Sequence, residues 1–395
     1  MLTPFETPSG VKHVWTTFSA DQIDVNAANP EVLLELLRVL LFYVKQGADL
    51  IRLDAIAYLC KTIGTSCIHL PETHLVVQIM RDVLDRVAPD VPLITETNVP
   101  HHENLSYFGD GSNEAQMVYQ FSLPPLLLHT FRTGDVSRLA AWGQTIQRVS
   151  DRTTYFNFCA SHDGIGVTPA RGLLADDEID AMLAMVEAHG GRVSYKDNGD
   201  GTRSPYEMNI TYFDAITDPA VTEHEPQTAA HRFLCSQAIM LAFVGVPGIY
   251  FHSLFGSRNW GEGVTLHGYN RAINRQKFGA DDLTAELARP DSLRARVFAG
   301  VKRLLAARTN EPAFHPFGHQ RVLDCGPQVF GLERTSPDKA QRVIALHNVS
   351  SSPVTVKLPE GRSRDLLSDG DYDQTIWLAP FQVAWLKYPV SAEAR

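Results

Sequence analysis

Three acidic residues stand where predicted strands end, and their type defines the chemistry open to this chain. Asp54, Glu96 and Asp163 each follow a run of strand-forming residues. Two carboxylates placed across a sugar are the minimum for glycoside chemistry, because one attacks the anomeric carbon or activates water while the other protonates the leaving oxygen. The distance between the two carboxyl groups decides whether the configuration at the anomeric carbon is retained or inverted. Their spacing along the chain leaves both outcomes open.

Arg52 precedes Asp54 by two residues in the predicted strand GADLIRLDAI, residues 47–56. Side chains alternate faces along a strand, so this cation and this carboxylate point the same way. One interpretation is a satisfied structural ion pair. The other is a carboxylate that the neighbouring cation keeps ionised, so that it can attack a substrate. The strand by itself favours neither.

Two other chemistries fit the sequence less well. Residues 161–163 read Ser-His-Asp, but adjacent residues on one strand cannot form the relay of a serine hydrolase, and no GxSxG elbow is present. The pairs His101-His102 and His69/His74 lack zinc-type ligand spacing. We therefore expect no metal site and no cofactor.

The elements that would position these acids alternate between strand and helix. One helix is predicted to begin after Asn29, which can cap it, with Pro30 as its first residue, and to end at Gly47. Further helices are predicted over 75–87, 137–149 and 231–244, and further strands over 91–97, 117–123, 155–163 and 245–252. Such alternation indicates parallel βα units, and polar residues at the C-terminal ends of several strands are typical of a (β/α) barrel active site.

Three segments do not follow this alternation. Residues 1–28 show little regular pattern, with loop signals at Pro4 and Pro8 and a short predicted strand over 14–18. Residues 164–228 form a long insertion, which we interpret as an active-site loop; a tolerated surface insertion is the alternative. After Arg308, short strands separated by turn residues predict a small antiparallel β domain.

Composition excludes several classes of partner. The net charge is -10, which argues against nucleic acid or an anionic membrane as the main partner. No apolar run is long enough to span a membrane, and the N-terminal residues lack the features of a signal peptide. The five cysteines, Cys60, Cys67, Cys159, Cys235 and Cys325, are odd in number and contain no CxxC, so we expect mostly buried thiols and a cytoplasmic location.

The segments GADLIRLDAI, LITETN and NFCASHDGIG resemble, in order, three conserved regions of the α-amylase superfamily of glycoside hydrolases. The stretches YLCKTIGTSCIHLPETH, FSLPPLLLHTFRTGD and HDGIGV are similar to the branch of the sucrose, sucrose 6-phosphate and glucosylglycerate phosphorylases. The resemblance covers nearly the whole chain, from about Val14. It implies a (β/α)8 barrel and transfer of glucose from an α-glucoside to phosphate.

The resemblance also implies residue roles. Asp54 would be the nucleophile that forms a β-glucosyl ester, Glu96 the general acid/base, and Asp163 the carboxylate that stabilises the distorted sugar. Arg52 would hold Asp54 ionised, and His162 would lie beside Asp163. The product would be α-glucose 1-phosphate.

Further residues are implied to bind substrate. Arg271, in GYNRAINR, matches a glucose-binding arginine of that branch, while Tyr206 and Glu207 match its mobile acceptor loop. Sucrose phosphorylases have Gln where this chain has Glu207. That difference is similar to the glucosylglycerate phosphorylases, in which an acidic residue meets the glycerate hydroxyls, and it favours glucosylglycerate over sucrose or its 6-phosphate.

The sequence also departs from the family's pattern, because it contains no DxxxNH and the first three barrel strands are expected upstream of Met1. The expected organisation is a remnant of an inserted domain (1–28), a barrel portion (29–306) with the insertion 164–228, and a C-terminal β domain (307–390). Two alternatives to the phosphorylase stay open: a retaining α-glucoside hydrolase or transglucosidase, and an inactive, poorly soluble remnant.

Overall fold

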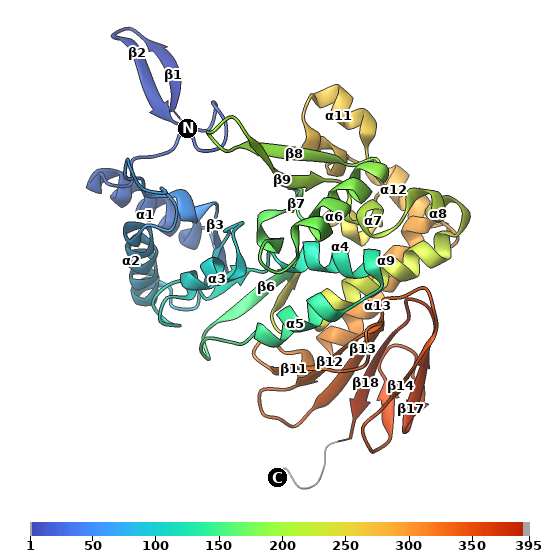
Figure 1. Cartoon of the computed structure of the whole chain (residues 1–395). Coiled ribbons are helices and arrows are strands. Elements are labelled where there is room, and N and C mark those ends of the chain that lie inside the picture. Colours follow the sequence, from blue (N-terminus) through green and yellow to red (C-terminus); the bar gives the residue numbers. More distant parts are fainter. Residues whose placement is uncertain (1, 390–395) are drawn as a thin grey trace. The chain divides into compact units, whose positions relative to one another are not determined.

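The computed structural model describes residues 2–389 (Figure 1). The chain divides into two compact units. The first contains the residues up to Asn98 together with His102–Tyr119 and Val149–Thr153, and the second contains Val99–His101, Gln120–Arg148 and the chain from Thr154 onward.

The first unit alternates strand and helix as predicted. Its elements are β1 (Leu2–Thr7), β2 (Gly10–Trp15), α1 (Pro30–Lys45), β3 (Ile51–Leu53), η1 (Ile56–Tyr58), α2 (Pro71–Val87), β4 (Leu93–Thr95), most of α3 (His101–Asn104), η2 (Leu105–Phe108) and β5 (Met117–Tyr119). Strands β3, β4 and β5 pair in parallel in that order. Parallel pairing brings the C-terminal ends of β3 and β4, and so Asp54 and Glu96, to the same edge of the sheet.

Helix α1 follows directly from its sequence signals. The side chain of Asn29 accepts a hydrogen bond from the Glu31 N–H, Pro30 is the first helical residue, and Gly47 lies just beyond the helix with a φ of 91°. The helix ends at Lys45, and Leu40 is its buried residue. The predicted cap and stop are confirmed, which fixes where the chain enters β3.

The N-terminal residues depart from the prediction. β1 and β2 form an antiparallel hairpin in which Pro4 pairs with His13, although Pro4 was expected to mark a loop. Proline is tolerated in a strand without a second neighbour because its missing N–H is not needed there. The predicted strand over 14–18 is also wrong in extent, since β2 ends at Trp15. Helix α2 begins at Pro71, four residues before the expected start.

The second unit contains a further parallel pair, β6 (Thr154–Phe158) and β10 (Val246–Gly248). Outside the insertion, the helices of the second unit are α4 (Leu123–Thr133), α5 (Ser137–Thr145), α9 (Pro226–Ala242), α10 (Phe251–Leu254), α11 (Gly261–His267), η4 (Asn270–Asn274), α12 (Ala280–Leu287) and α13 (Leu293–Thr309). Both strands are shorter than predicted. Residues 159–163 lie beyond β6, and Phe251 and His252 belong to α10 rather than to a strand.

The insertion is folded rather than an open loop. It contains β7 (Ile165–Gly166), η3 (Thr168–Ala170), α6 (Asp176–Ala188), β8 (Arg192–Asp197), β9 (Arg203–Asn209), α7 (Tyr212–Ile216) and α8 (Pro219–His224). The three strands form an antiparallel sheet in the order β7-β9-β8. The loop signal at 197–201 is the turn of the β8–β9 hairpin. Tyr206 and Glu207, expected in a mobile loop, instead belong to strand β9.

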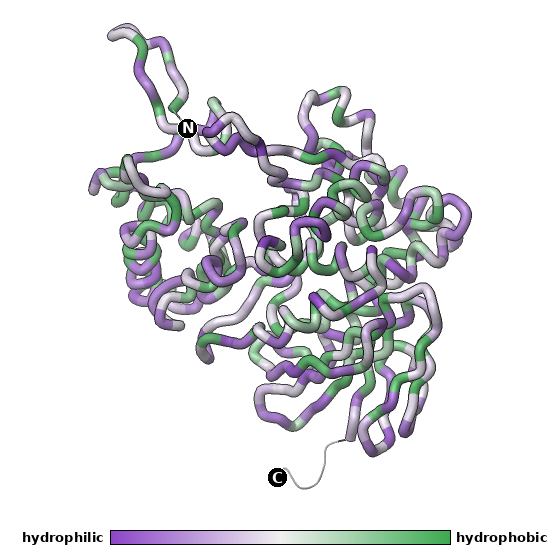
Figure 2. The backbone as a smooth tube through the Cα atoms, in the orientation of Figure 1, coloured by the Kyte–Doolittle hydropathy of each residue, from purple (hydrophilic) through white to green (hydrophobic). Residues whose placement is uncertain are grey.

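The C-terminal residues form the antiparallel β domain that was predicted. After η5 (Pro312–Phe314), strands β11 (His319–Leu323), β12 (Val329–Thr335), β13 (Arg342–Asn348), β18 (Val383–Tyr388), β15 (Ser363–Asp365) and β16 (Asp371–Tyr372) form one sheet in that order. A second sheet pairs β14 (Val354–Lys357) with β17 (Thr375–Leu378). Figure 2 shows both hydrophobic and hydrophilic stretches in the C-terminal strands, and Ile344, Leu346, Ile376 and Leu386 form part of the buried core.

The fold confirms the predicted class, which is parallel βα units followed by an antiparallel β domain. The five cysteines are free thiols, and all except Cys325 are buried, as expected. Among residues 2–389, no helix is long and apolar enough to cross a membrane.

Candidate active site

Arg52 brings two of the predicted catalytic carboxylates together in the first unit. Its Nη1 lies 2.5 Å from Oδ1 of Asp54, and its Nη2 lies 3.8 Å from Oε2 of Glu96. Asp54 and Glu96 follow the neighbouring parallel strands β3 and β4. Strand pairing therefore sets both acids beside one guanidinium, whereas the spacing of Arg52 and Asp54 predicted only that these two residues share a face.

The two carboxylates have different surroundings. The side chain of Asp54 is 73% exposed, whereas that of Glu96 is only 14% exposed. Oε2 of Glu96 accepts a hydrogen bond of 2.9 Å from the backbone N–H of Ala55. Ala55 has a φ of 46°, in the left-handed region that a residue with a Cβ seldom adopts. This turn ends β3 and aims its N–H at Glu96, so the orientation of Glu96 is fixed while Asp54 faces solvent.

Aromatic side chains complete the first cluster. The Arg52 guanidinium lies over the ring of Tyr119, 5.5 Å from its centroid. Burial lowers the pKa of Arg52, but Tyr119, Asp54 and Glu96 together outweigh it, so the pKa is raised overall. Burial also raises the pKa of Tyr119, against the opposing effect of Arg52. Arg52 is therefore a permanent cation beside two carboxylates.

A second cluster surrounds Asp163 in the second unit. Oδ1 of Asp163 lies 2.5 Å from Nη1 of Arg271 and 3.2 Å from Nη2 of Arg275. The Nε2 atom of His162 lies 3.6 Å from the same oxygen, and the His162 side chain is largely exposed. Two guanidinium groups therefore hold one oxygen of the Asp163 carboxylate in place.

Arg275 is a site residue that sequence reasoning missed. Its Nε donates to the backbone carbonyl of His162 at 2.6 Å, and its guanidinium lies 5.9 Å from the ring centroid of Tyr269. The sequence contained a signal for Arg275, because this residue ends the same GYNRAINR segment that contains Arg271. The sequence-based prediction named only Arg271.

Glu207 is buried and fully engaged by Arg271. Nε of Arg271 donates to Oε2 of Glu207 at 3.0 Å, and Nη2 donates to Oε1 at 2.9 Å. This is the bidentate geometry in which a guanidinium matches a carboxylate, and it is stronger and more directional than a single contact. Glu207 therefore fixes the orientation of Arg271. Tyr206 precedes Glu207 on β9, and its backbone carbonyl accepts a hydrogen bond of 3.0 Å from the Val167 N–H.

Backbone contacts hold Asp163 close to Glu207. Gly164 follows Asp163, and a Cβ placed there would lie 2.6 Å from both Cγ of Glu207 and the backbone oxygen of Met208. In the adjoining strands, Gly166 of β7 pairs with Glu207 of β9. Nδ2 of Asn274 donates to the backbone oxygen of Asp163 at 2.9 Å, so η4 is anchored to the same segment. The cluster thus rests on a glycine and an asparagine that the sequence did not mark.

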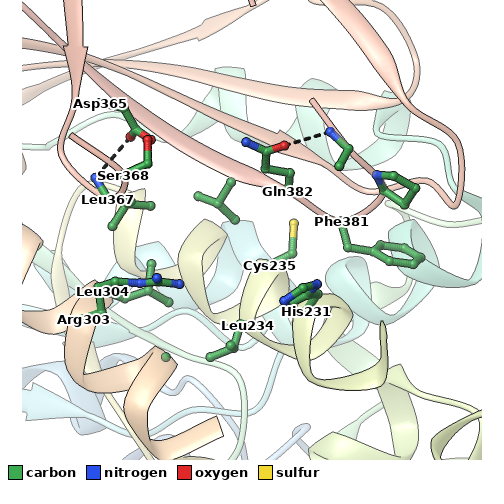
Figure 3. A pocket seen from close by; sticks show the side chains of 14 residues that line it. His231, Leu234, Cys235, Arg303, Leu304, Asp365, Leu367, Ser368, Phe381 and Gln382 are labelled. Atoms are coloured by element: carbon green, nitrogen blue, oxygen red, sulfur yellow. Dashed lines mark hydrogen bonds between the residues drawn. The ribbon is translucent and has the colours of Figure 1, made fainter. Parts of the chain in front are cut away.

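A separate cavity of about 290 Å³ lies in the second unit between α9, α13 and the C-terminal strands (Figure 3). Its lining is mainly apolar, with His231 and Arg303 on the helices and Gln382 on the β domain. The residues that line it include none of the predicted site residues. Within residues 2–389, His, Cys, Asp and Glu side chains form no group of three or more that could hold a metal ion.

Comparisons with known proteins identify the relatives of this chain. The family model described as the catalytic domain of α-amylase matches residues 11–186. The glucosylglycerate phosphorylase of Spirochaeta thermophila is 49% identical over 97% of this chain and 68% of its own length. That of Allomeiothermus silvanus is 50% identical over 98% of this chain and 68% of its own length.

The fold also matches a solved structure. Sucrose 6F-phosphate phosphorylase from Thermoanaerobacter thermosaccharolyticum superposes with a TM-score of 0.75 at 21% identity, covering 94% of this chain and 70% of that one. This similarity shows the fold, and the closer sequence relatives show the family.

Proposed function

This chain belongs to the α-amylase family and, within it, to the group of the glucosylglycerate phosphorylases, and from this membership we propose that it transfers glucose from glucosylglycerate to phosphate. It is a glycoside phosphorylase, with an α-glucoside and inorganic phosphate as its substrates. The structural observation that supports the assignment is the contact of one guanidinium, that of Arg52, with two carboxylates of different exposure. Such a pair provides a nucleophile and an acid/base.

The proposed reaction proceeds in two displacements. In the first, a carboxylate oxygen of Asp54 attacks C1 of the glucosyl group while Glu96 protonates the departing glycerate oxygen. This step breaks the glycosidic bond and leaves a β-glucosyl ester on Asp54. In the second, a phosphate oxygen attacks C1, the ester bond breaks, and Glu96 takes up the proton of the phosphate. Two inversions give α-glucose 1-phosphate with net retention.

Arg52 supports the first displacement in this proposal. Its guanidinium contacts the Asp54 carboxylate before attack and contacts it again when the ester is cleaved. The hydrogen bond from the Ala55 N–H holds Glu96 in place through both proton transfers. Fixed positions matter here, because misplacement of about 1 Å of a reacting group is enough to slow catalysis strongly.

The second cluster takes the substrate-binding roles. We propose that Asp163 carries the negative charge that stabilises the oxocarbenium-like transition state, with His162 and Arg271 as substrate-binding neighbours. Tyr206 and Glu207 are proposed to act on the acceptor side. The contacts of Asp163 with Arg271 and Arg275 support this role, because they fix the position of the carboxylate.

A single assay tests the function. The purified protein is incubated with glucosylglycerate, with and without phosphate, and α-glucose 1-phosphate and free glucose are both measured. We expect α-glucose 1-phosphate only when phosphate is present, and a lower rate with sucrose or sucrose 6-phosphate. Free glucose released at the same rate with and without phosphate would instead identify a hydrolase.

We also propose a cytoplasmic location. It is supported by five free thiols, four of them buried, since unpaired cysteines persist where the compartment is reducing. Cell fractionation followed by immunodetection tests this, and recovery in a secreted fraction would contradict it.

A further inference from the structure

We propose that Arg271 recognises the carboxylate of glycerate, and that Glu207 is a positioning residue that acts through Arg271 rather than by binding the acceptor itself. This inference rests on the proposed function and specifies which group selects the acceptor. It also gives a different reason for the presence of Glu207 in this chain.

The exposure of the two side chains supports this division of roles. The side chain of Glu207 is 4% exposed, whereas that of Arg271 is 39% exposed. Both oxygens of Glu207 accept hydrogen bonds from Arg271. A ligand that arrives from solvent therefore meets the guanidinium, while the carboxylate lies behind it.

Arg271 retains hydrogen-bonding capacity for a ligand. A guanidinium has five N–H groups. Arg271 uses its Nε and one Nη2 N–H on Glu207, and one Nη1 N–H on Asp163. In the part of the chain that the structure describes, the other N–H groups, one on each terminal nitrogen, have no acceptor. A carboxylate ligand can accept from such free N–H groups through its two oxygens.

The local charge favours a singly charged ligand. Asp163 and Glu207 carry two negative charges, and Arg271 and Arg275 carry two positive charges, so the cluster is neutral overall. A monoanion brings one negative charge to this neutral cluster. A phosphate monoester brings nearly two, and Glu207 and Asp163 repel it more strongly. A neutral acceptor leaves the free N–H groups of Arg271 without a partner. The arrangement therefore favours glycerate over fructose 6-phosphate and over glycerol.

The test compares acceptors that differ in one group. In the synthetic direction, α-glucose 1-phosphate is supplied and transfer to glycerate is compared with transfer to glycerol, which lacks the carboxylate. For Arg271→Gln we expect the KM for glycerate to rise ~10- to 100-fold more than the KM for glycerol, the range expected for lost hydrogen bonds to a charged group, because any effect of the variant on Asp163 is common to both acceptors. Arg321→Gln is the control, because it removes the same charge from an exposed pair in the β domain. Equal losses with both acceptors would overturn the proposal.

Glu207→Gln tests the positioning role. We expect a raised KM for glycerate, a smaller change in kcat, and gained transfer to fructose 6-phosphate, because the repelling charge is gone. Arg271→Lys should not restore glycerate selection, since an ammonium cannot make the bidentate contact with Glu207. An unchanged preference between glycerate and fructose 6-phosphate in Glu207→Gln would contradict this role.

Direct binding separates this inference from the proposed function. Glycerate is titrated into the wild-type protein and into Arg271→Gln by calorimetry in the absence of sugar phosphate. Weakening of at least about tenfold in the variant supports the inference, even if transfer to phosphate is not detected. Phosphorolysis with glycerate binding unaffected by Arg271→Gln would overturn the inference and leave the proposed function in place.

Discussion

Nη1 of Arg52 lies 2.5 Å from Oδ1 of Asp54, and the two residues are two positions apart at the end of β3. The contact joins a half-buried cation to a carboxylate that is mostly in solvent. An ion pair of this exposure contributes about 0–1 kcal/mol to stability. Stability alone therefore gives little reason for it, and the proposed nucleophile gives a better one.

Asp54→Ala is expected to lower phosphorolysis of glucosylglycerate by ~10³-fold or more, because no carboxylate remains to form the glucosyl ester. The thermal unfolding midpoint should change little, because the Asp54 side chain is mostly exposed. Initial rates and thermal melts check both points. Activity that survives in the folded variant would remove Asp54 from the mechanism.

The loss of activity in Glu96→Gln is expected to depend on the leaving group of the glucosyl donor. The variant cannot protonate the departing glycerate oxygen, so kcat with glucosylglycerate should fall ~10²- to 10⁴-fold. With α-glucosyl fluoride, whose fluoride departs without a proton, formation of the glucosyl ester should be much less affected. Equal losses with the two donors would mean that Glu96 is not the general acid.

Arg52→Lys is expected to reduce activity ~10- to 100-fold, because one ammonium cannot contact Asp54 and Glu96 as the two guanidinium nitrogens do. Stability should change by no more than about 1 kcal/mol. The control is Arg38→Lys, which alters an exposed Arg–Glu pair on α1. A variant that lost stability and kept its activity would indicate a purely structural pair.

Gly164→Ala is expected to destabilise the second cluster by about 1–3 kcal/mol, because the new Cβ meets Cγ of Glu207 and a backbone oxygen at 2.6 Å. The KM for glycerate should rise as well, since Glu207 must shift. Gly261→Ala is the matched control, because no atom lies within 4 Å of its Cβ position. Chemical denaturation of the two variants measures the difference, and equal stabilities would contradict the packing argument.

The β domain should lose stability in mild acid through His347. This residue is completely buried, Trp385 donates to its Nε2 at 3.3 Å, and its Nδ1 lies 3.0 Å from the Phe330 carbonyl. Burial lowers the pKa of His347 to about 4, against an ordinary value of about 6.5. The unfolded chain therefore binds the proton first as the pH falls, and up to about 3 kcal/mol is lost between pH 6.5 and 4.

His347→Gln provides the control for this pH effect. The variant should be less stable at pH 7, because glutamine cannot reproduce both ring contacts, but its stability should fall less steeply between pH 6.5 and 4. Urea unfolding followed at several pH values gives the two slopes. Parallel slopes for the variant and the wild-type protein would exclude His347 as the titrating group.

The sequence by itself determined the chemistry and the local elements. Carboxylates after strand-forming runs predicted Asp54 and Glu96 at one sheet edge, and the structure places both beside Arg52. Asn29 and Gly47 predicted the limits of α1. These features succeed because a cap, a turn or a two-residue alternation depends on interactions within a few residues, which the order of side chains specifies directly.

Only the tertiary structure decided the second cluster. Arg271 and Glu207 are 64 residues apart, and nothing near either residue predicts that they pair. Residues 203–209 contain Pro205 and were expected to be a mobile loop, but pairing with β7 and β8 makes them a strand. Hydrogen bonds and packing between distant segments outweighed the local preference of these residues for a loop. Which distant segments become neighbours depends on the tertiary structure, and local sequence signals do not encode it.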